Sequence, residues 1–141
     1  MIHIFLFILS YDVWFYLSHL ILHNKTVYKI IHKYHHSIDH NIIKYKDTYV
    51  GHFVESPLQG MGVAIPLLFI KFNLHIFLCS LLIINIRGML RHDVRSIWLI
   101  GNHHILHHKY PQCNYGEYWL DTLFGTSCPH KDEYIFGMIY I

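Results

Sequence analysis

Charged residues are scarce in this sequence. Asp, Glu, Lys and Arg together make up 14% of its 141 residues, whereas 53% are hydrophobic and the mean hydropathy is +0.28. This composition is too apolar for an ordinary soluble domain and favours a membrane protein. The formal net charge of +2 is small and the basic residues are scattered, which argues against nucleic acid as a partner. Residues 1–141 are short enough to form a single domain.

Cysteine is scarce as well, with three residues that have no C-x-x-C spacing. An odd number of cysteines cannot complete a disulfide framework, so we interpret them as idle thiols in a reducing compartment. The sequence also lacks the H-E-x-x-H motif of zinc proteases, and no histidine motif contains a glutamate that could act as a general base. A membrane metalloprotease is therefore a poor interpretation.

Histidine, in contrast, accounts for 15 residues, and two stretches share the motif H-x-x-H-H. The first begins at His32 and the second at His104. On a helix, residues three and four apart lie on one face, so the three imidazoles of each motif can point toward one metal ion. Neutral imidazole binds zinc, iron, copper and nickel, and the spacing alone does not choose among them.

Three further histidines have suitable spacing. His19 and His23 are four residues apart, and His92 lies twelve residues before His104. Nine histidines are too many for one ion, because a structural zinc takes four ligands and a catalytic zinc usually takes three plus water. The pattern therefore predicts two metal ions. The predicted ligands, which are also the predicted catalytic residues, are His19, His23, His32, His35, His36, His92, His104, His107 and His108.

The roles of two other histidines stay open. His103 is four residues before His107 and could replace His104, but the repeated motif favours His104. His52 stands near Glu55 and is more simply a hydrogen-bonded structural residue. Polar side chains downstream of the second motif could orient the metal-bound imidazoles, although the same stretch also fits an amphipathic helix that stops at a glycine. These candidates are Asn114, Glu117 and Asp121.

Residues 2–22 are mostly apolar and contain no Lys or Arg. A run of this length can cross about 30 Å of hydrocarbon, so it predicts a transmembrane helix at about residues 2–23. The run lacks the positive start and the small-residue cleavage site of a secretory signal, so we expect it to be retained. Asp12 would be costly inside a bilayer unless it faces a polar interior, and it shares one helix face with Tyr16 and His19.

A second apolar region extends over residues 61–86. One straight crossing would place the two H-x-x-H-H motifs on opposite sides of the membrane, where they could not share a centre. We therefore predict an apolar helical hairpin that turns near residues 71–73. Lysines after the first helix and arginines after the hairpin both mark the cytoplasmic side. The expected fold is all-α, an integral membrane helical bundle with a cytoplasmic, histidine-rich helical cap formed by residues 24–60 and 87–130.

Taken together, these motifs resemble the fatty acid hydroxylase and sterol desaturase superfamily of integral membrane di-iron enzymes. The resemblance covers residues 12–126 and includes the histidine motifs, the helix face of Asp12 and the stretch from Asn114 to Thr126. The pair His92-Asp93 looks more like the sterol C5-desaturase branch than the fatty acid 2-hydroxylase branch. Members of the family usually have further membrane helices ahead of the first motif.

The resemblance implies a di-iron centre, bound by the nine histidines at the cytoplasmic face, that uses O2 to hydroxylate or desaturate a sterol, fatty acyl or sphingoid lipid. Zinc could substitute for iron. Electrons would come from NAD(P)H through cytochrome b5 or a similar electron-donor protein. The membrane would be the endoplasmic reticulum in a eukaryote or a viral host, and the inner membrane in a bacterium. A partner copy in a homo-oligomer could close the lipid tunnel.

A different class of function is also compatible with the sequence. A truncated, non-catalytic membrane protein could keep its histidines as a structural metal clamp. Such a protein would bind zinc tightly and would consume no O2 with any lipid and reductant. The sequence does not separate hydroxylation from desaturation, and it does not identify the lipid.

Overall fold

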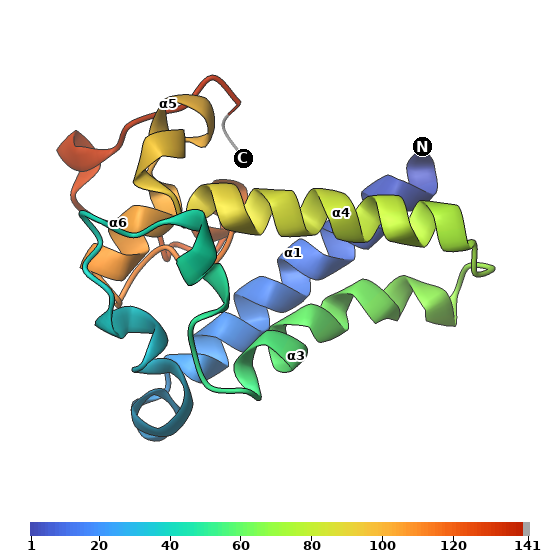
Figure 1. Ribbon diagram of the computed structural model, residues 1–141, viewed down its shortest axis with the longest axis horizontal. Helices are drawn as coiled ribbons and strands as arrows, with labels where there is room; N and C mark the ends of the chain where they lie inside the picture. The colour runs from blue at the N-terminus through green and yellow to red at the C-terminus, as the bar shows by residue number, and fades with distance from the viewer. Residues whose placement is uncertain (140–141) are drawn as a thin grey trace.

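The computed structural model describes residues 1–139, and all regular structure in that range is helical, as the sequence predicted. The N-terminus and the turn at residues 69–73 lie at one end of the molecule, and the histidine-rich segments lie at the other (Figure 1). Three long arms connect the two ends. They are helix α1 (Ile2–Leu22), the continuous pair α3 (Glu55–Gly60) and η4 (Met61–Leu68), and helix α4 (Leu74–Arg91).

Helix α1 forms because its 21 residues are mostly apolar and include no proline or glycine. It packs closely against η4, where Gly62 has no room for a side chain, because a Cβ atom there would lie only 2.4 Å from Cβ of Trp14. Two hydrogen bonds join the arms, from Ser10 Oγ to the Gly62 carbonyl (2.9 Å) and from Trp14 Nε1 to the Leu58 carbonyl (2.7 Å). Arms α1 and α3–η4 therefore form one packed unit.

The chain reverses direction between η4 and α4, at residues 69–73, where the sequence places its polar break (Figure 1). Asn73 caps α4, because its Oδ1 accepts a hydrogen bond from the Ile76 amide (3.1 Å). The first arm of the hairpin includes Pro66 and is a 3-10 helix that continues α3. The second arm runs on to Arg91, beyond the expected end at residue 86. Entry of this hairpin into a membrane stays a prediction.

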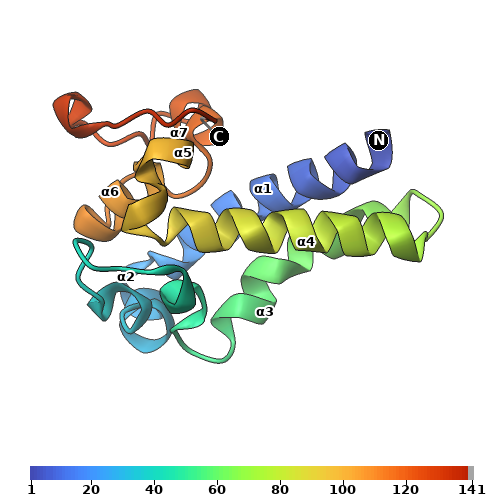
Figure 2. The same cartoon turned by 45° about the horizontal axis from the view of Figure 1, so that its top comes forward.

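The opposite end of the molecule is a cap of short helices around the ends of α1 and α4 (Figure 2). Glycine is required at residue 101, where φ is 79° and the chain turns between two of these helices. The cap contains α2 (Lys25–Val27), η1 (Tyr28–His32), η2 (His35–Ser37), η3 (Tyr45–Tyr49), η5 (Val94–Ser96), α5 (Ile97–Ile100), α6 (His103–Lys109), α7 (Tyr118–Leu123) and η6 (Lys131–Glu133).

The long arms expose large apolar side chains along much of their length. In the apolar stretch of α4 only 11% of the residues are buried inside the protein, compared with 33% for α1. Both helices are long and apolar enough to cross a membrane. Soluble proteins rarely leave such large apolar patches uncovered, so the surface favours a membrane environment. The exposed apolar residues of α4 are Leu74, Leu78, Leu82, Ile83 and Ile86.

Four charged side chains are largely buried where α1, α4 and the segment before α7 meet. Arg87 donates to Oδ2 of Asp12 (3.1 Å) and to Oε1 of Glu117 (2.6 Å), and Arg91 also pairs with Glu117. Two guanidinium groups and two carboxylates balance in charge, which compensates the loss of their hydration. Asp12 thus faces a polar interior, as its position in an apolar helix requires.

Candidate metal centre

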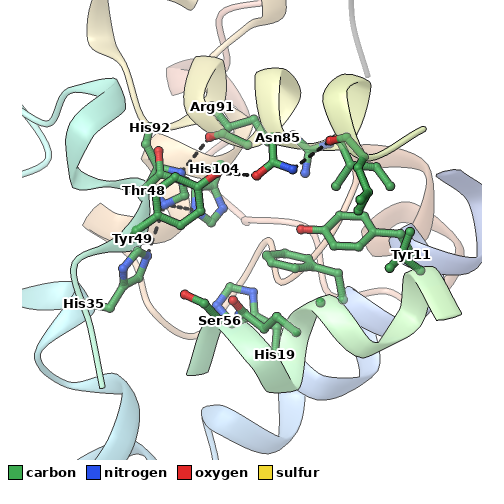
Figure 3. A pocket seen from close by; sticks show the side chains of 17 residues that line it. Tyr11, His19, His35, Thr48, Tyr49, Ser56, Asn85, Arg91, His92 and His104 are labelled. Atoms are coloured by element: carbon green, nitrogen blue, oxygen red, sulfur yellow. Dashed lines mark hydrogen bonds between the residues drawn. The ribbon is translucent and has the colours of Figure 1, made fainter. Parts of the chain in front are cut away.

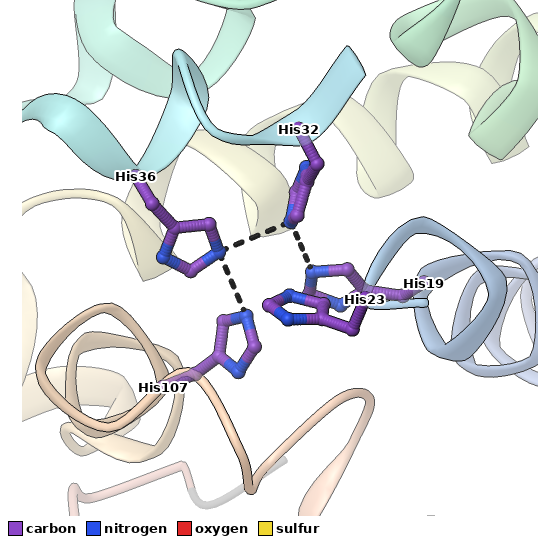
Figure 4. A group of neighbouring side chains, drawn as sticks. All are labelled: His19, His23, His32, His36 and His107. Atoms are coloured by element: carbon purple, nitrogen blue, oxygen red, sulfur yellow. Dashed lines mark hydrogen bonds between the residues drawn. The ribbon is translucent and has the colours of Figure 1, made fainter. Parts of the chain in front are cut away.

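Nine histidine side chains converge in two adjacent groups at the cap end of α1 and α4. Within each group, the nitrogen atoms that could bind a metal lie within 4.8 Å of one another, and Figure 4 shows the larger group. These are the nine histidines that the sequence analysis selected, and their role as ligands stays a prediction. The first group contains His19, His23, His32, His36 and His107, and the second contains His35, His92, His104 and His108.

Each H-x-x-H-H motif contributes to both groups, whereas we expected its three histidines to share one ion. In α6, His104 and His108 are four residues apart and lie on one face, toward the second group. His107 is rotated by about 100° from His108 and belongs to the first group. The motifs thereby hold the groups side by side, and the rings of His36 and His108, one from each group, have centroids 4.7 Å apart.

The first motif divides in the same way through an irregular helix. Residues Tyr28–His32 form a single π-helical turn, a feature that is frequent at functional sites. His32 and His36 belong to the first group, and His35 in η2 belongs to the second. The long helices position the remaining members of the two groups, which are His19 within α1, His23 directly after α1 and His92 directly after α4.

Hydrogen bonds fix the tautomer of five of these rings. In each ring Nδ1 donates its proton to an oxygen atom of the protein, which leaves a bare lone pair on Nε2. A bare imidazole nitrogen is the atom that binds a metal ion. The acceptors are the carbonyls of Tyr115 for His19 (2.6 Å), Cys113 for His107 (2.6 Å), Val50 for His35 (2.8 Å) and Gly88 for His92 (2.9 Å), and Oε1 of Glu55 for His32 (2.9 Å).

These Nε2 lone pairs face one another at distances that a shared cation explains. Nε2 of His19 lies 2.9 Å from Nε2 of His32, and Nε2 of His35 lies 3.1 Å from Nε2 of His92. All four rings donate through Nδ1, so no proton remains to bridge either pair. Two imidazole nitrogens bound at right angles to one metal, each at a distance of 2.0–2.1 Å, would be about 3 Å apart. The donor set therefore fits one metal ion in each group.

Buried nitrogen atoms without a partner point to the same conclusion. Nε2 of His23 and both ring nitrogens of His108 are buried and form no hydrogen bond. Buried polar atoms without partners are rare in folded proteins, because each one loses its hydration without compensation. Coordination of a metal ion by His23 and His108 would restore a partner in each group.

Burial keeps these imidazoles neutral, and the neutral form is the one that binds metal. The pKa of His104, His107 and His108 is lowered well below its usual value. Burial is the main cause, and repulsion from neighbouring histidines is the second. For His23 and His92 the pKa falls to about 4 and about 3, again mainly because of burial. At neutral pH a metal ion therefore does not have to displace a proton from these rings.

Glu55 is a buried carboxylate beside the first group. Nδ1 of His32 donates to Oε1 of Glu55 when the carboxylate is ionised, and burial by itself raises the pKa of Glu55 to about 8. A cation bound by His32 would oppose that shift by favouring the ionised carboxylate. The sequence analysis paired Glu55 with His52 instead. The side chain of His52 lies outside both groups and accepts a hydrogen bond from the Val54 amide (3.3 Å), so the expected side-chain pair is replaced by the contact with His32.

Residues 113–116 include the two carbonyl groups that orient His19 and His107. Asn114, with a φ of 60°, fixes this segment through its side chain. Its Nδ2 donates to the His103 carbonyl (3.0 Å), and its Oδ1 accepts from the Cys128 amide (2.7 Å) and the Tyr134 hydroxyl (2.8 Å). Asparagine suits the site because it tolerates positive φ and both donates and accepts hydrogen bonds.

Asp121 supports the same segment from α7. Its carboxylate accepts from the amides of Tyr115 and Gly116 (2.8 Å each) and from the Thr126 hydroxyl (2.6 Å). It also contacts Nε2 of His103 (3.0 Å), so His103 points away from both histidine groups. The position of His103 therefore favours His104 as the ligand, in agreement with the repeated motif.

The three polar residues downstream of the second motif act less directly than we expected. Within residues 1–139, the side chains of Asn114 and Glu117 bond to no imidazole of either group, and the only imidazole that Asp121 contacts is that of His103, which is outside them. Backbone carbonyls orient four of the nine rings instead. Such carbonyls leave no signal in the sequence, because every residue has one, and only folding brings them next to an imidazole.

A cavity of about 140 Å³ lies between the three long arms and reaches the second group (Figure 3). Its wall includes His35, His92 and His104 of that group, but only His19 of the first. A molecule in this cavity would therefore meet the second group first. Aromatic and apolar side chains of the arms line one part of the remainder, among them Tyr11, Phe15, Val63, Leu81 and Ile84. Polar side chains line the other part, and they include Thr48, Ser56, Gln59, Asn85 and Arg91.

Comparisons with known proteins add an independent finding. The profile of the fatty acid hydroxylase family matches residues 4–126. Delta(7)-sterol 5(6)-desaturase ERG3B of Gibberella zeae is 28% identical over 132 aligned residues, which cover 86% of this chain and 40% of that protein. Delta(7)-sterol 5(6)-desaturase erg3C of Aspergillus fumigatus is 31% identical over 143 aligned positions, which cover 82% of this chain and 45% of that protein.

The chain thus spans less than half the length of these two relatives. No solved structure matches it. The family profile nevertheless covers most of the chain, including every histidine of both groups, and both relatives are sterol desaturases. The chain therefore belongs to the fatty acid hydroxylase family, in its sterol desaturase-like branch, as its histidine motifs predicted.

Proposed function

We propose that this chain is an O2-dependent oxidoreductase that hydroxylates or desaturates a lipid at a di-iron centre bound by the nine histidines. The observation that carries the proposal is the convergence of bare Nε2 atoms in two buried groups, beside a cavity between apolar helices. Imidazole ligands suit iron, although zinc could take its place. Bound iron would supply the activation of O2, a chemistry that no side chain provides.

The residues of the chain would prepare this site in three ways. Backbone carbonyls and Glu55 hold the imidazoles in the tautomer that leaves Nε2 free. Burial keeps the rings neutral and keeps water away from the reacting atoms. The cavity would hold a C–H bond of the lipid on the side of the second group, where His92 and His104 form part of the wall. The sterol desaturase relatives make a sterol the first substrate to test.

The proposed environment is a membrane, with the three long arms in lipid and the histidine groups at the cytoplasmic surface. The endoplasmic reticulum is the expected membrane in a eukaryote or a viral host, and the inner membrane in a bacterium. A lipid could then reach the cavity from between the arms without crossing water. A second copy of the chain could cover the exposed apolar faces of the arms and so complete the wall of a lipid tunnel.

The alternative function is a structural metal clamp in a non-catalytic membrane protein. The small size of the cavity favours this alternative, because about 140 Å³ holds only a few methylene groups of a lipid. A clamp and an oxygenase make opposite predictions for O2. The clamp would bind zinc and consume no O2 with any lipid and reductant, whereas the oxygenase requires iron and O2.

A direct test uses detergent-solubilised protein loaded with iron under anaerobic conditions. Metal analysis should give close to two ions per chain. The protein is reduced with dithionite, mixed with a sterol, a fatty acyl lipid or a sphingoid lipid, and exposed to O2. Mass spectrometry should then show a product that has gained one oxygen atom or lost two hydrogen atoms. Zinc-loaded protein is the control, and folded protein that binds no metal would contradict the proposal.

A further inference from the structure

A groove of about 550 Å³ opens on the cap, on the solvent side of the first histidine group. Its wall includes His23, a member of that group, whose ring is flanked by Tyr28 and Tyr115 with centroid distances of 5.4 and 5.1 Å. The cavity between the long arms touches a different part of the centre, mainly the second group. The two groups are therefore approached from two separate openings.

Three lysines line this groove. Lys25, Lys29 and Lys33 follow one another at intervals of four residues, and all three are exposed. Within residues 1–139 none of them forms an ion pair with a carboxylate, and no acidic residue lines the groove. The groove therefore presents three uncompensated positive charges beside His23, which attract an anionic partner over about 10 Å at moderate ionic strength.

Exposed apolar side chains accompany these lysines. Ile30 and Tyr34 are 69% and 65% exposed, and each directly follows a lysine of the groove in the sequence. Large apolar and aromatic side chains surrounded by charged ones are typical of a protein–protein interface, in which the apolar centre supplies affinity and the charged rim supplies orientation. This combination fits a protein partner better than a free anion.

The proposed reactions require an external source of electrons, and this step rests on the proposed function. Hydroxylation consumes one C–H bond, O2, two electrons and two protons, and it yields one C–OH bond and one water. Desaturation consumes two C–H bonds with the same O2, electrons and protons, and it yields one C=C bond and two waters. The lipid supplies two electrons in either case, and the other two must come from an external reductant.

We propose that the lysine groove over His23 is the docking surface for an acidic protein that carries single electrons to the first histidine group. The groove suits this role because His23 is both part of that group and part of the groove wall. Lipid would occupy the cavity on the other side, so the carrier and the substrate could be bound at the same time. Lys25, Lys29 and Lys33 would set the orientation of the carrier.

The test compares two variants with the same change in charge. Lys29→Glu/Lys33→Glu alters the groove, whereas Lys44→Glu/Lys46→Glu alters exposed lysines outside its wall. Binding of the soluble haem domain of cytochrome b5, an acidic one-electron carrier, is measured by calorimetry at about 20 mM salt. We expect the groove variant to raise Kd about tenfold and the control variant to change it less than twofold, with the difference shrinking at about 500 mM salt.

Two further measurements make the outcome decisive. Both variants should retain the metal content of the parent protein, and both should form product in a single turnover after chemical reduction by dithionite, which bypasses the carrier. Loss of product there would count against the proposed function and not against the docking surface. Equal effects of the two variants on Kd would overturn the docking proposal. The docking proposal would also be overturned if the groove variant bound the carrier with an unchanged Kd but bound phosphatidylserine vesicles more weakly. That result would assign the lysines to a lipid headgroup.

Discussion

The Nε2 atoms of His19 and His32 lie 2.9 Å apart in a buried site, although each ring already donates its Nδ1 proton to an oxygen atom elsewhere. Two lone pairs at this distance repel each other. The two rings come from α1 and from the π-helical turn η1, and a cation bound between them would remove the repulsion. Metal binding should therefore stabilise the folded protein.

Removal of metal is the first test of this stabilisation. Each ion present at 100 times its Kd would stabilise the folded protein by about 2.7 kcal/mol. Two ions would therefore contribute about 5 kcal/mol, which corresponds to roughly 20 °C in Tm for a chain of this size. We expect exhaustive chelation to lower Tm by about that amount, as measured by intrinsic fluorescence, and iron or zinc to restore it. An unchanged Tm would mean that the histidine groups are stable without a cation.

The division into two groups predicts separable losses of metal. His23→Ala removes a ligand from the first group and His108→Ala removes one from the second, so each variant should retain about one firmly bound ion per chain. His75→Ala is the matched control, because His75 is exposed near the start of α4 and lies outside both groups. Metal analysis after gel filtration gives the result. If one substitution removed both ions, the groups would be a single cooperative site.

Glu55 should matter for the first group alone. Its carboxylate fixes the tautomer of His32, and partners of this kind typically contribute 10-fold to 100-fold to metal affinity. We expect Glu55→Gln to weaken binding of the first-group ion by about tenfold, since the amide oxygen can still accept the hydrogen bond but carries no charge. Competition with a chelator of known affinity measures the change. Asp132→Asn, on an exposed carboxylate outside both groups, should leave both affinities unchanged.

The histidine pattern was sufficient to predict the members of both groups, because ligand spacing on helices is a local property of the sequence. It was not sufficient to predict their partition. Whether His35 joins His32 or His92 depends on the π-helical turn at residues 28–32 and on the approach of α4, and neither feature has a local signal. The role of Glu55 was missed for the same reason, since its contact with His32 spans 23 residues.

Asn114 should contribute to stability and to metal binding through the segment that it supports. Asn114→Ala removes three buried hydrogen bonds and places alanine at a φ of 60°, so we expect a loss of about 2–4 kcal/mol in the free energy of unfolding. Asn114→Gly removes the same hydrogen bonds without the backbone strain and should be less destabilising. Denaturant titration of both variants separates the two effects, and equal losses would show that the strain is unimportant.

The last prediction concerns the position of the chain in a membrane. At 1.5 Å per residue, α1 and α4 are about 31 and 27 Å long, which is close to the roughly 30 Å of hydrocarbon in a bilayer. With the histidine groups at one surface, the turn at residues 69–73 should then lie near the opposite surface. Lys71, which is exposed in this turn, could reach the headgroups there.

Single cysteines in a Cys79→Ser background can test this arrangement, because the other two cysteines are buried. Asn41 and Lys131 are exposed positions of the cap on either side of the hairpin in sequence, and Lys71 marks its turn. In sealed vesicles, an impermeant thiol reagent should label Asn41→Cys and Lys131→Cys from the same side. The same reagent on that side should not label Lys71→Cys. Labelling of the two cap positions from opposite sides would separate the H-x-x-H-H motifs by a membrane, and a centre built from both motifs could then not form.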